Sequence, residues 1–160
     1  MSPSKRQKLN QIVASYGDLI FDLCDSLLGN SASAQIAFRS IIKKIRSDIR
    51  GDHYQTYERS WVLKIASQQL VSLIEQRGEI VEPKRQIEID SQFDSGHRLK
   101  YLDFYFRRLR PEIQLLLLLK DKYQIPHEEI AAALGTPVDT LKLQRGQALK
   151  TLEEWMWTNY

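Results

Sequence analysis

The sequence has a single cysteine, Cys24, among its 160 residues, which excludes a disulfide within the chain. Because disulfides persist mainly in oxidising compartments, this composition fits a reducing one. Long apolar runs are also missing: the stretch from Leu115 to Leu119 is far shorter than the ~20 residues of a membrane span. The basic first residues are not followed by an apolar segment, so no signal peptide is expected. These absences predict a cytoplasmic protein that does not enter a membrane.

The patterns from which enzyme and metal sites are built are missing as well. The histidines His53, His97 and His127 are scattered, and none has a metal-ligand spacing with Cys24. No Gly-rich phosphate-binding loop and no nucleophile elbow is present. We therefore expect no catalytic residues, no metal and no cofactor, which argues for a binding protein and against an enzyme.

What the sequence does have is enough apolar material for a core and a slight excess of positive charge. Hydrophobic residues make up 42% of the chain, and the formal net charge is +3. Such a charge permits a nucleic-acid partner without requiring one, because the distribution of charge says more than its sum.

Apolar residues recur at three- and four-residue spacing through most of the chain, which predicts helices. In the first half the pattern favours helices from about residue 7 to Leu28, from Ser31 or Ser33 to Ile49, and from about Tyr54 to Arg77. In the second half it favours helices over Arg98–Arg107, Pro111–Tyr123, His127–Leu134 and Pro137–Trp157. The predicted fold class is all-α.

Between these two groups of helices the pattern disappears. The segment "GEIVEPKRQIEIDSQFDSGH" is rich in acidic residues and contains a proline and two glycines, so it is predicted to be a linker. Within it "QIEID" alternates and is able to pair as a short strand. The predicted organisation is a three-helix domain over residues 1–78, a linker over 79–97 and a four-helix domain over 98–160.

The stretch "EEIAAALGTPVDTLKLQRGQALKTLEEW", residues 128–155, predicts a helix-turn-helix motif. Gly135 is able to take the left-handed conformation that ends the first helix. Thr136 is a good N-cap for the second helix, and Pro137 suits its first turn. A small residue, Ala131, lets the second helix cross close to the first. Together these signals favour a true helix-turn-helix over a generic helical hairpin.

The same region resembles region 4 of the extracytoplasmic-function sigma factors. The matching positions are Glu129-Ile130-Ala131, Leu134-Gly135, Thr140, Ala148 and Leu152. The first half resembles region 2 of that family more loosely, through Trp61-Val62 and Ile65-Ala66. The resemblance implies a protein that binds the RNA polymerase core and promoter DNA. Region 2 would hold the polymerase clamp and open the −10 element, while region 4 would read the −35 element.

The sequence also departs from the family pattern. Gln35, Ile36 and Arg39 stand where acidic and polar groups are usual, and Ser67-Gln68 replaces an Arg-Asn pair. In the second helix of the motif Arg145 takes an apolar position. These departures leave a second hypothesis open. The sigma scaffold would then be an adaptor or decoy that binds an anti-sigma factor or another regulatory protein without opening promoters.

Candidate DNA contacts follow from the motif. They are Thr140, Lys142, Leu143, Gln144 and Arg145 on its second helix, with Lys120 and Lys122 before it. Lysine reaches phosphate, glutamine pairs with the edge of adenine, and Leu143 would touch a thymine methyl group or a partner protein. The alternative is that the polar ones simply solvate an exposed surface.

Two further surfaces are candidates for binding a partner. Arg39, Lys43, Arg46 and Arg50 fall at i, i+4, i+7 and i+11, which places four cations on one helix face without an acidic residue among them. An anionic partner is expected there, either nucleic acid or an acidic protein, unless the stripe is merely solvated. At the C-terminus, Trp157 belongs to an aromatic cluster that cannot all face one core, so we expect it to contact a partner.

Overall fold

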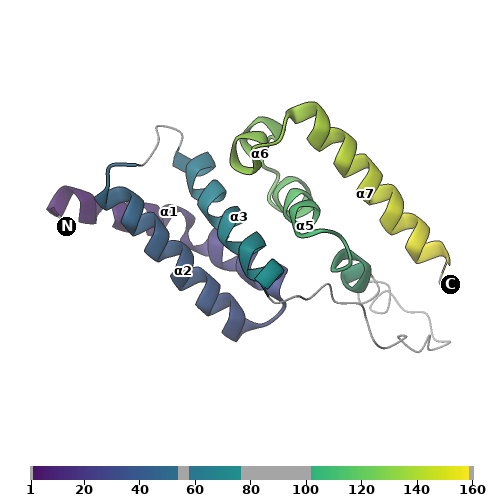
Figure 1. Cartoon of the computed structure of the whole chain (residues 1–160), viewed down its shortest axis with the longest axis horizontal. Coiled ribbons are helices and arrows are strands. Elements are labelled where there is room, and N and C mark those ends of the chain that lie inside the picture. The colour runs from purple at the N-terminus through teal and green to yellow at the C-terminus, as the bar shows by residue number, and fades with distance from the viewer. Residues whose placement is uncertain (1, 54–57, 77–101, 159–160) are drawn as a thin grey trace.

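The computed structural model describes residues 2–53, 58–76 and 102–158, and within these ranges every regular element is a helix (Figure 1). The elements are α1 (Pro3–Leu28), α2 (Ser31–Arg50), α3 (Glu58–Gln76), α5 (Pro111–Leu117), the π-helical turn η1 (Leu118–Lys122), α6 (His127–Leu134) and α7 (Val138–Thr158). Residues 102–106 are helical too. The all-α prediction is confirmed. The predicted linker over 79–97, with its "QIEID" segment, lies outside the described residues.

The ends of the first helices follow from local chemistry. Helix α1 begins at Pro3, earlier than the apolar pattern indicated, because the Ser2 hydroxyl accepts the N–H of Lys5 at 3.3 Å. Gly29 ends it in the left-handed conformation, with φ at 75°. The next residue, Asn30, caps α2, because its side-chain oxygen accepts a hydrogen bond from the N–H of Ser33 at 2.7 Å. Two long helices are therefore joined by a turn of only two residues.

The predicted helix over Pro111–Tyr123 has two geometries. It is α-helical to Leu117 and then widens into the π-helical η1, where the N–H of Tyr123 donates to the carbonyl of Leu118 at 3.0 Å. The start of α5 is held by the buried side chain of Gln114. Its amide donates to the carbonyl of Leu109 at 2.7 Å and so fixes the turn that leads into α5.

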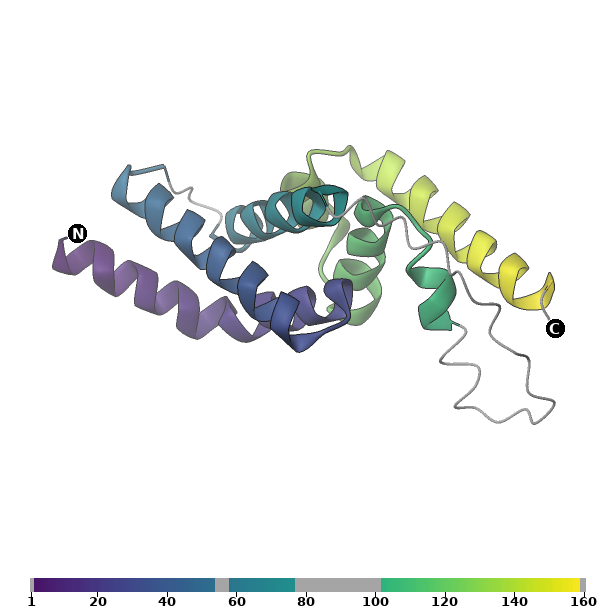
Figure 2. The same cartoon turned by 60° about the horizontal axis from the view of Figure 1, so that its bottom comes forward.

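Helices from both halves of the chain contribute to one apolar core. Ile20 of α1, Ile41 of α2 and Leu63 of α3 belong to the same buried cluster as Leu115, Ile130 and Leu141, residues of α5, α6 and α7. Figures 1 and 2 show α3 lying beside α5 and α6, and α3 contacts both. Trp61 is 4% exposed and belongs to the same cluster. The two halves are thus docked on each other, and their division into domains stays a prediction.

A second cluster joins the helical residues 102–106 to α5 and α7. It consists of Tyr105, Ile113, Leu117, Ala148 and Leu152. The last two are buried residues of α7. This cluster holds the C-terminal half of α7, while the main core holds its first turn through Leu141.

Polar contacts also join the two halves at the rim of the core. The guanidinium of Arg59 in α3 donates twice to the carboxylate of Glu129 in α6, at 2.6 and 2.5 Å. On the other side, Asp22 of α1 accepts from the Tyr123 hydroxyl and from Lys122, and these bonds hold the pKa of Asp22 below its ordinary value. Because the charged groups are partly exposed, each pair contributes at most about 1 kcal/mol. Apolar packing supplies most of the docking free energy.

No helix among the residues that the structure describes is both long enough and apolar enough to span a membrane.

Candidate nucleic-acid interface

The turn between α6 and α7 has the left-handed glycine that its sequence predicts. Gly135 has φ 67° and ψ 30°, and its N–H donates to the carbonyl of Ala131 at 2.9 Å. The N–H of Thr136 donates to the same carbonyl at 3.3 Å, so the backbone of this residue also closes the turn. Helix α7 then starts at Val138, after Pro137. The Thr136 side chain makes no hydrogen bond among those that the described residues form, so its predicted role as N-cap is not seen.

The corner of the motif is fixed by three apolar side chains. Ile130 is fully buried, Ala133 is 3% exposed and Leu141 is 1% exposed, and all belong to the main core. Leu134 and Ala131 are half-buried beside them. Since these contacts come from α6 and from the first turn of α7, the angle between the two helices is set by the core. The exposed side of α7 is thereby presented on a rigid support.

The exposed side of α7 carries three of the predicted DNA contacts. Thr140, Lys142 and Leu143 are all exposed, and Leu143 has 61% of its surface open to solvent. A leucine this open near the start of the helix contributes nothing to the core. It is available to another molecule.

Basic side chains from η1 and α7 lie near His127, the first residue of α6. Burial lowers the pKa of this imidazole, and Lys120, Lys142 and Arg145 lower it further, against the opposite effect of Glu128. The Nε2 atom of His127 is buried and lacks a hydrogen-bond partner in the described part of the chain. Burial and the nearby cations thus both favour the neutral imidazole over the charged one.

Two of the predicted phosphate contacts are already engaged within the protein. The guanidinium of Arg145 donates to the carboxylate of Asp121 through Nε at 3.0 Å and Nη2 at 2.5 Å, which raises the pKa of Arg145. Lys122 binds Asp22 and the Ser26 hydroxyl, both at 3.0 Å. The charges of Arg145 and Lys122 are thus partly neutralised, whereas Lys120 and Lys142 form no ion pair among the described residues.

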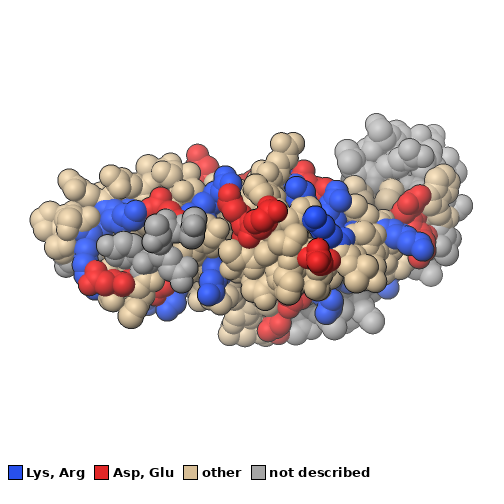
Figure 3. Space-filling model, turned by 90° about the horizontal axis from the view of Figure 1, so that it is seen from above, with Lys and Arg blue, Asp and Glu red and all other residues tan. Residues whose placement is uncertain are grey.

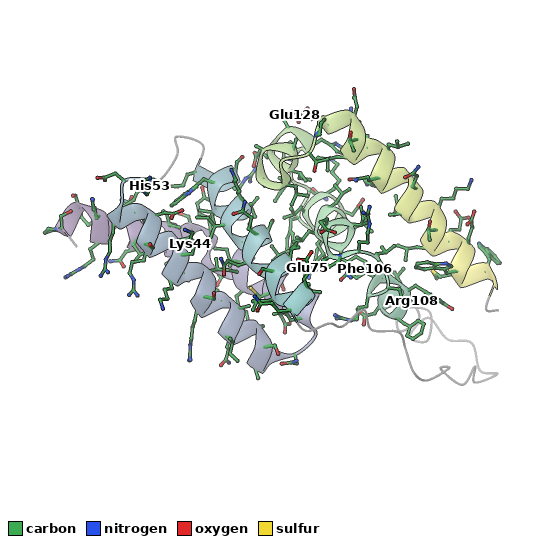
Figure 4. All side chains as sticks on the ribbon, in the orientation of Figure 1. Lys44, His53, Glu75, Phe106, Arg108 and Glu128 are labelled. Atoms are coloured by element: carbon green, nitrogen blue, oxygen red, sulfur yellow. The ribbon has the colours of Figure 1, made fainter. Side chains whose placement is uncertain are left out.

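Gln144 lies on a different side of α7 from Lys142 and Leu143. It lines a pocket of about 440 Å³ between α3 and the helix-turn-helix, together with Ser67 of α3 and the backbone turn at Gly135. Ser67 is 3% exposed and its hydroxyl makes no hydrogen bond in the described structure. Figure 4 shows Glu75, another lining residue, at the end of α3 close to α5. In the docked arrangement Gln144 is turned toward α3.

The face seen in Figure 3 carries a mixed distribution of charge. Basic and acidic side chains alternate along it without forming one continuous basic field. This pattern agrees with the ion pairs at Arg145 and Lys122, in which an acid from another segment meets each cation. A nucleic acid would meet scattered cations on this face.

The basic stripe of α2 is exposed as predicted. Arg39, Lys43, Arg46 and Arg50 all lie open to solvent, and none forms an ion pair within the described residues. At the other end of the chain Trp157 is 71% exposed, while Trp155 stacks under the guanidinium of Arg108 at 5.1 Å. The exposure of Trp157 agrees with the expectation that the C-terminal aromatics do not all face one core, and its contact with a partner stays a prediction.

Sequence reasoning missed the acidic partners of these cations. Asp121 and Asp22 were not singled out, because nothing in their local pattern indicates that η1 meets α7 or that α1 meets η1. It also missed Ala133, which is buried beside Ile130 although Leu134 continues the apolar spacing more regularly. Within the described residues there is no group of three or more His, Cys, Asp or Glu side chains that is arranged to hold a metal ion.

Comparison with known proteins adds no family to these observations. The chain matches no protein-family model, and no curated protein matches it.

Proposed function

We propose that this chain is a sigma-factor-like regulator of bacterial transcription initiation, which binds the RNA polymerase core and promoter DNA in the cytoplasm. The observation that carries the proposal is the helix-turn-helix, in which Gly135 takes the left-handed turn and α7 presents Lys142 and Leu143 to solvent. In such motifs the second helix lies in the major groove with its N-terminal residues at the base edges. The resemblance of this segment to region 4 makes promoter DNA the expected target.

The exposed residues divide the work of DNA binding by their chemistry. Lys142 reaches a phosphate, and its charge is reinforced by the nearby Lys120. Thr140 has a hydroxyl that suits either a base edge or the backbone, and Leu143 offers an apolar surface to a thymine methyl group. This division predicts that Lys142 sets affinity and salt dependence, while Leu143 and Thr140 set sequence preference.

The mechanism is recruitment. The first half of the chain docks on polymerase, and the helix-turn-helix positions the complex at DNA. Lys142 and Leu143 are accessible in the docked arrangement, whereas Gln144 is turned toward α3. Base reading by Gln144 therefore requires the whole helix-turn-helix to move relative to α3, and because α6 would move with α7, the contact between Arg59 of α3 and Glu129 of α6 would break.

A second candidate function is favoured by the ion pairs. Because Arg145 and Lys122 are engaged with Asp121 and Asp22, fewer cations are free for phosphate than the sequence indicated. The open Leu143 suits a protein contact as well as a thymine methyl group. The alternative is therefore an adaptor or decoy that binds an anti-sigma factor or another regulatory protein and does not open promoters.

The experiment begins with a pull-down of core RNA polymerase by the purified protein, followed by run-off transcription from a fragment library. Fragments that give specific transcripts are then used in binding assays at several salt concentrations. Lys142→Ala with Leu143→Ala should abolish specific binding, because both side chains are exposed near the start of α7. Lys142→Ala alone should lower the slope of log affinity against log salt by about 0.9. Lys150→Ala, which removes another exposed charge further along α7, is the matched control.

Stable polymerase binding with promoter-specific transcripts supports the sigma-like function. Unchanged DNA binding in the double variant, with normal folding, excludes the proposed reading face. If polymerase is not retained and no fragment is bound specifically, the adaptor function replaces the first proposal. An apolar protein interface would then show little dependence on salt, in contrast to phosphate contacts.

A further inference from the structure

The outer face of α2 has the composition of a binding surface that is separate from the helix-turn-helix. Its four exposed cations are Arg39, Lys43, Arg46 and Arg50. Successive members are about 6, 4.5 and 6 Å apart along the helix axis. None of them has an acidic partner within the described residues. Like charges at this spacing weaken a helix, so the stability of α2 does not account for the stripe.

Another cation of the same helix shows the contrast. Lys44, labelled in Figure 4, lies off the stripe and pairs with Asp48 at 3.2 Å, four residues further along. Helix α2 thus neutralises a cation on one side and leaves the cations of the stripe unpaired. The unpaired group is confined to a single face.

The cations surround a small apolar groove. A cavity of about 180 Å³ is lined by Phe38 and Ile42, with Arg39, Lys43 and Arg46 around it. The ring of Phe38 packs edge-on against Phe21 of α1, with the ring centres 5.8 Å apart. Both apolar residues of the groove also pack against the main core. The floor of the groove is therefore backed by fixed side chains and is present before any partner binds.

One more apolar side chain extends this surface. Ile36 is 65% exposed and lies one turn before Arg39 and Ser40 on the same helix. An open isoleucine next to the cations adds apolar contact area that a purely ionic partner would leave unused. The face is therefore amphipathic, with an apolar groove and an apolar edge among positive charges.

We propose that this face of α2 binds an acidic amphipathic helix of a partner protein, which places one apolar side chain in the groove and carboxylates against Arg39, Lys43 and Arg46. Two helices have the same rise per residue, so carboxylates one and two turns apart on the partner match the spacing of the cations. The arginines bind carboxylates through two parallel hydrogen bonds, which fixes the register. The apolar anchor supplies the desolvated centre of the contact.

Nucleic acid fits this face less well. A phosphate backbone meets the cations but has no apolar group for the groove. Stacking of a base requires an open aromatic face, whereas Phe38 is half-buried and packed against Phe21. The site is independent of DNA binding by α7, and it remains if the helix-turn-helix proves to have another role.

The test uses the full chain and a fluorescein-labelled synthetic helical peptide. The peptide carries glutamates at i, i+4 and i+7 around one leucine, and binding is followed by fluorescence anisotropy. Lys43→Glu with Arg46→Glu should lower the affinity by at least about tenfold. Lys44→Glu, a reversal of charge on the same helix but off the stripe, should change it by less than about twofold. Circular dichroism confirms that both variants are folded.

Changes in the peptide test the groove without altering the protein. Replacing the leucine by alanine should weaken binding by about tenfold, and replacing the glutamates by glutamine should remove most of it. Equal binding of the alanine peptide would contradict the groove, and equal loss in the Lys44→Glu variant would contradict the stripe. Duplex and single-stranded DNA of random sequence are the competitors. Tighter binding of either one, lost in the Lys43→Glu, Arg46→Glu variant, would overturn the proposal and make the face a nucleic-acid site.

Discussion

Alanine substitutions at two glycines of the helix-turn-helix should change the free energy of unfolding in opposite directions. A methyl group at Gly135 or at Gly146 would meet no atom within 4 Å, so neither substitution causes a clash. The difference lies in the backbone. Gly146 is in the interior of α7, whereas Gly135 has φ 67°, a conformation that disfavours any L-residue with a side chain.

The magnitudes follow from the backbone alone. Alanine is more favourable than glycine in a helix interior by about 0.8–1 kcal/mol, so Gly146→Ala should stabilise the protein by that amount. The left-handed conformation costs an L-residue about 1–2 kcal/mol, so Gly135→Ala should destabilise it accordingly. The two variants should therefore differ by roughly 2–3 kcal/mol, although each adds only one methyl group.

Urea denaturation followed by circular dichroism measures both free energies of unfolding. The dependence of the free energy on urea concentration should be the same in both variants, which checks that they unfold in the same way as the parent protein. For a chain of this size 1 kcal/mol corresponds to about 2–4 °C in Tm. If Gly135→Ala proves neutral, the left-handed turn is not a requirement of the fold, and the angle between α6 and α7 needs another explanation. If Gly146→Ala destabilises the protein, the exposed side of α7 is packed against something in solution.

Three further predictions concern charge. Asp121→Asn should release Arg145 and lower the free energy of unfolding by at most about 1 kcal/mol. It should also steepen the slope of log DNA affinity against log salt by about 0.9, because the freed guanidinium reaches a phosphate. An unchanged slope would show that Arg145 does not reach phosphate. Burial and nearby cations lower the pKa of His127 in the folded protein, so the unfolded protein binds more protons at this residue. The free energy of unfolding should therefore decrease as the pH falls below 6.5, the ordinary pKa of the imidazole. His127→Gln should reduce that loss in denaturation midpoints measured across the range, and an identical profile would exclude His127 as its source. Lys43→Glu should raise stability by a few tenths of a kcal/mol in urea, since it removes two repulsions along α2; a lower midpoint would contradict the unpaired stripe.

The helices and the turn were predictable because their causes are local. Helix α6 has the predicted bounds of His127–Leu134, and the left-handed conformation at Gly135 follows from the residue type. Helix α1 begins earlier than predicted, since a serine cap and a proline extend it beyond its apolar pattern. The π-helical turn after Leu117 had no signal in the sequence, because an uninterrupted run of leucines is compatible with either helical geometry.

The candidate site was predicted less completely because its chemistry depends on contacts between distant segments. A helical pattern identifies Lys142, Leu143 and Arg145 as residues near the start of α7, but it does not show that Asp121 lies beside Arg145. Nor does it show that Gln144 is turned toward α3. Side chains on one short segment thus lie in three different environments: the solvent, an ion pair with Asp121 and the pocket beside α3. The contacts between distant segments determine which residue lies in which environment.

The departures from the sigma pattern have different physical consequences in the two halves. Arg145 stands at a position that is apolar in the family, yet Asp121 neutralises it and the corner of the motif remains packed. In α3, by contrast, Ser67 stands where the family pattern has an arginine, and it lies buried beside a pocket without a hydrogen bond in the described structure. Under the proposed function, a charge that would meet polymerase or nucleic acid is therefore missing there. If the proposed function holds, the motif of α6 and α7 offers the reading face, while the first half has the altered surface chemistry. We therefore expect DNA binding and polymerase binding to be separable, and we expect the sequence changes to weaken the polymerase contact more than the DNA contact.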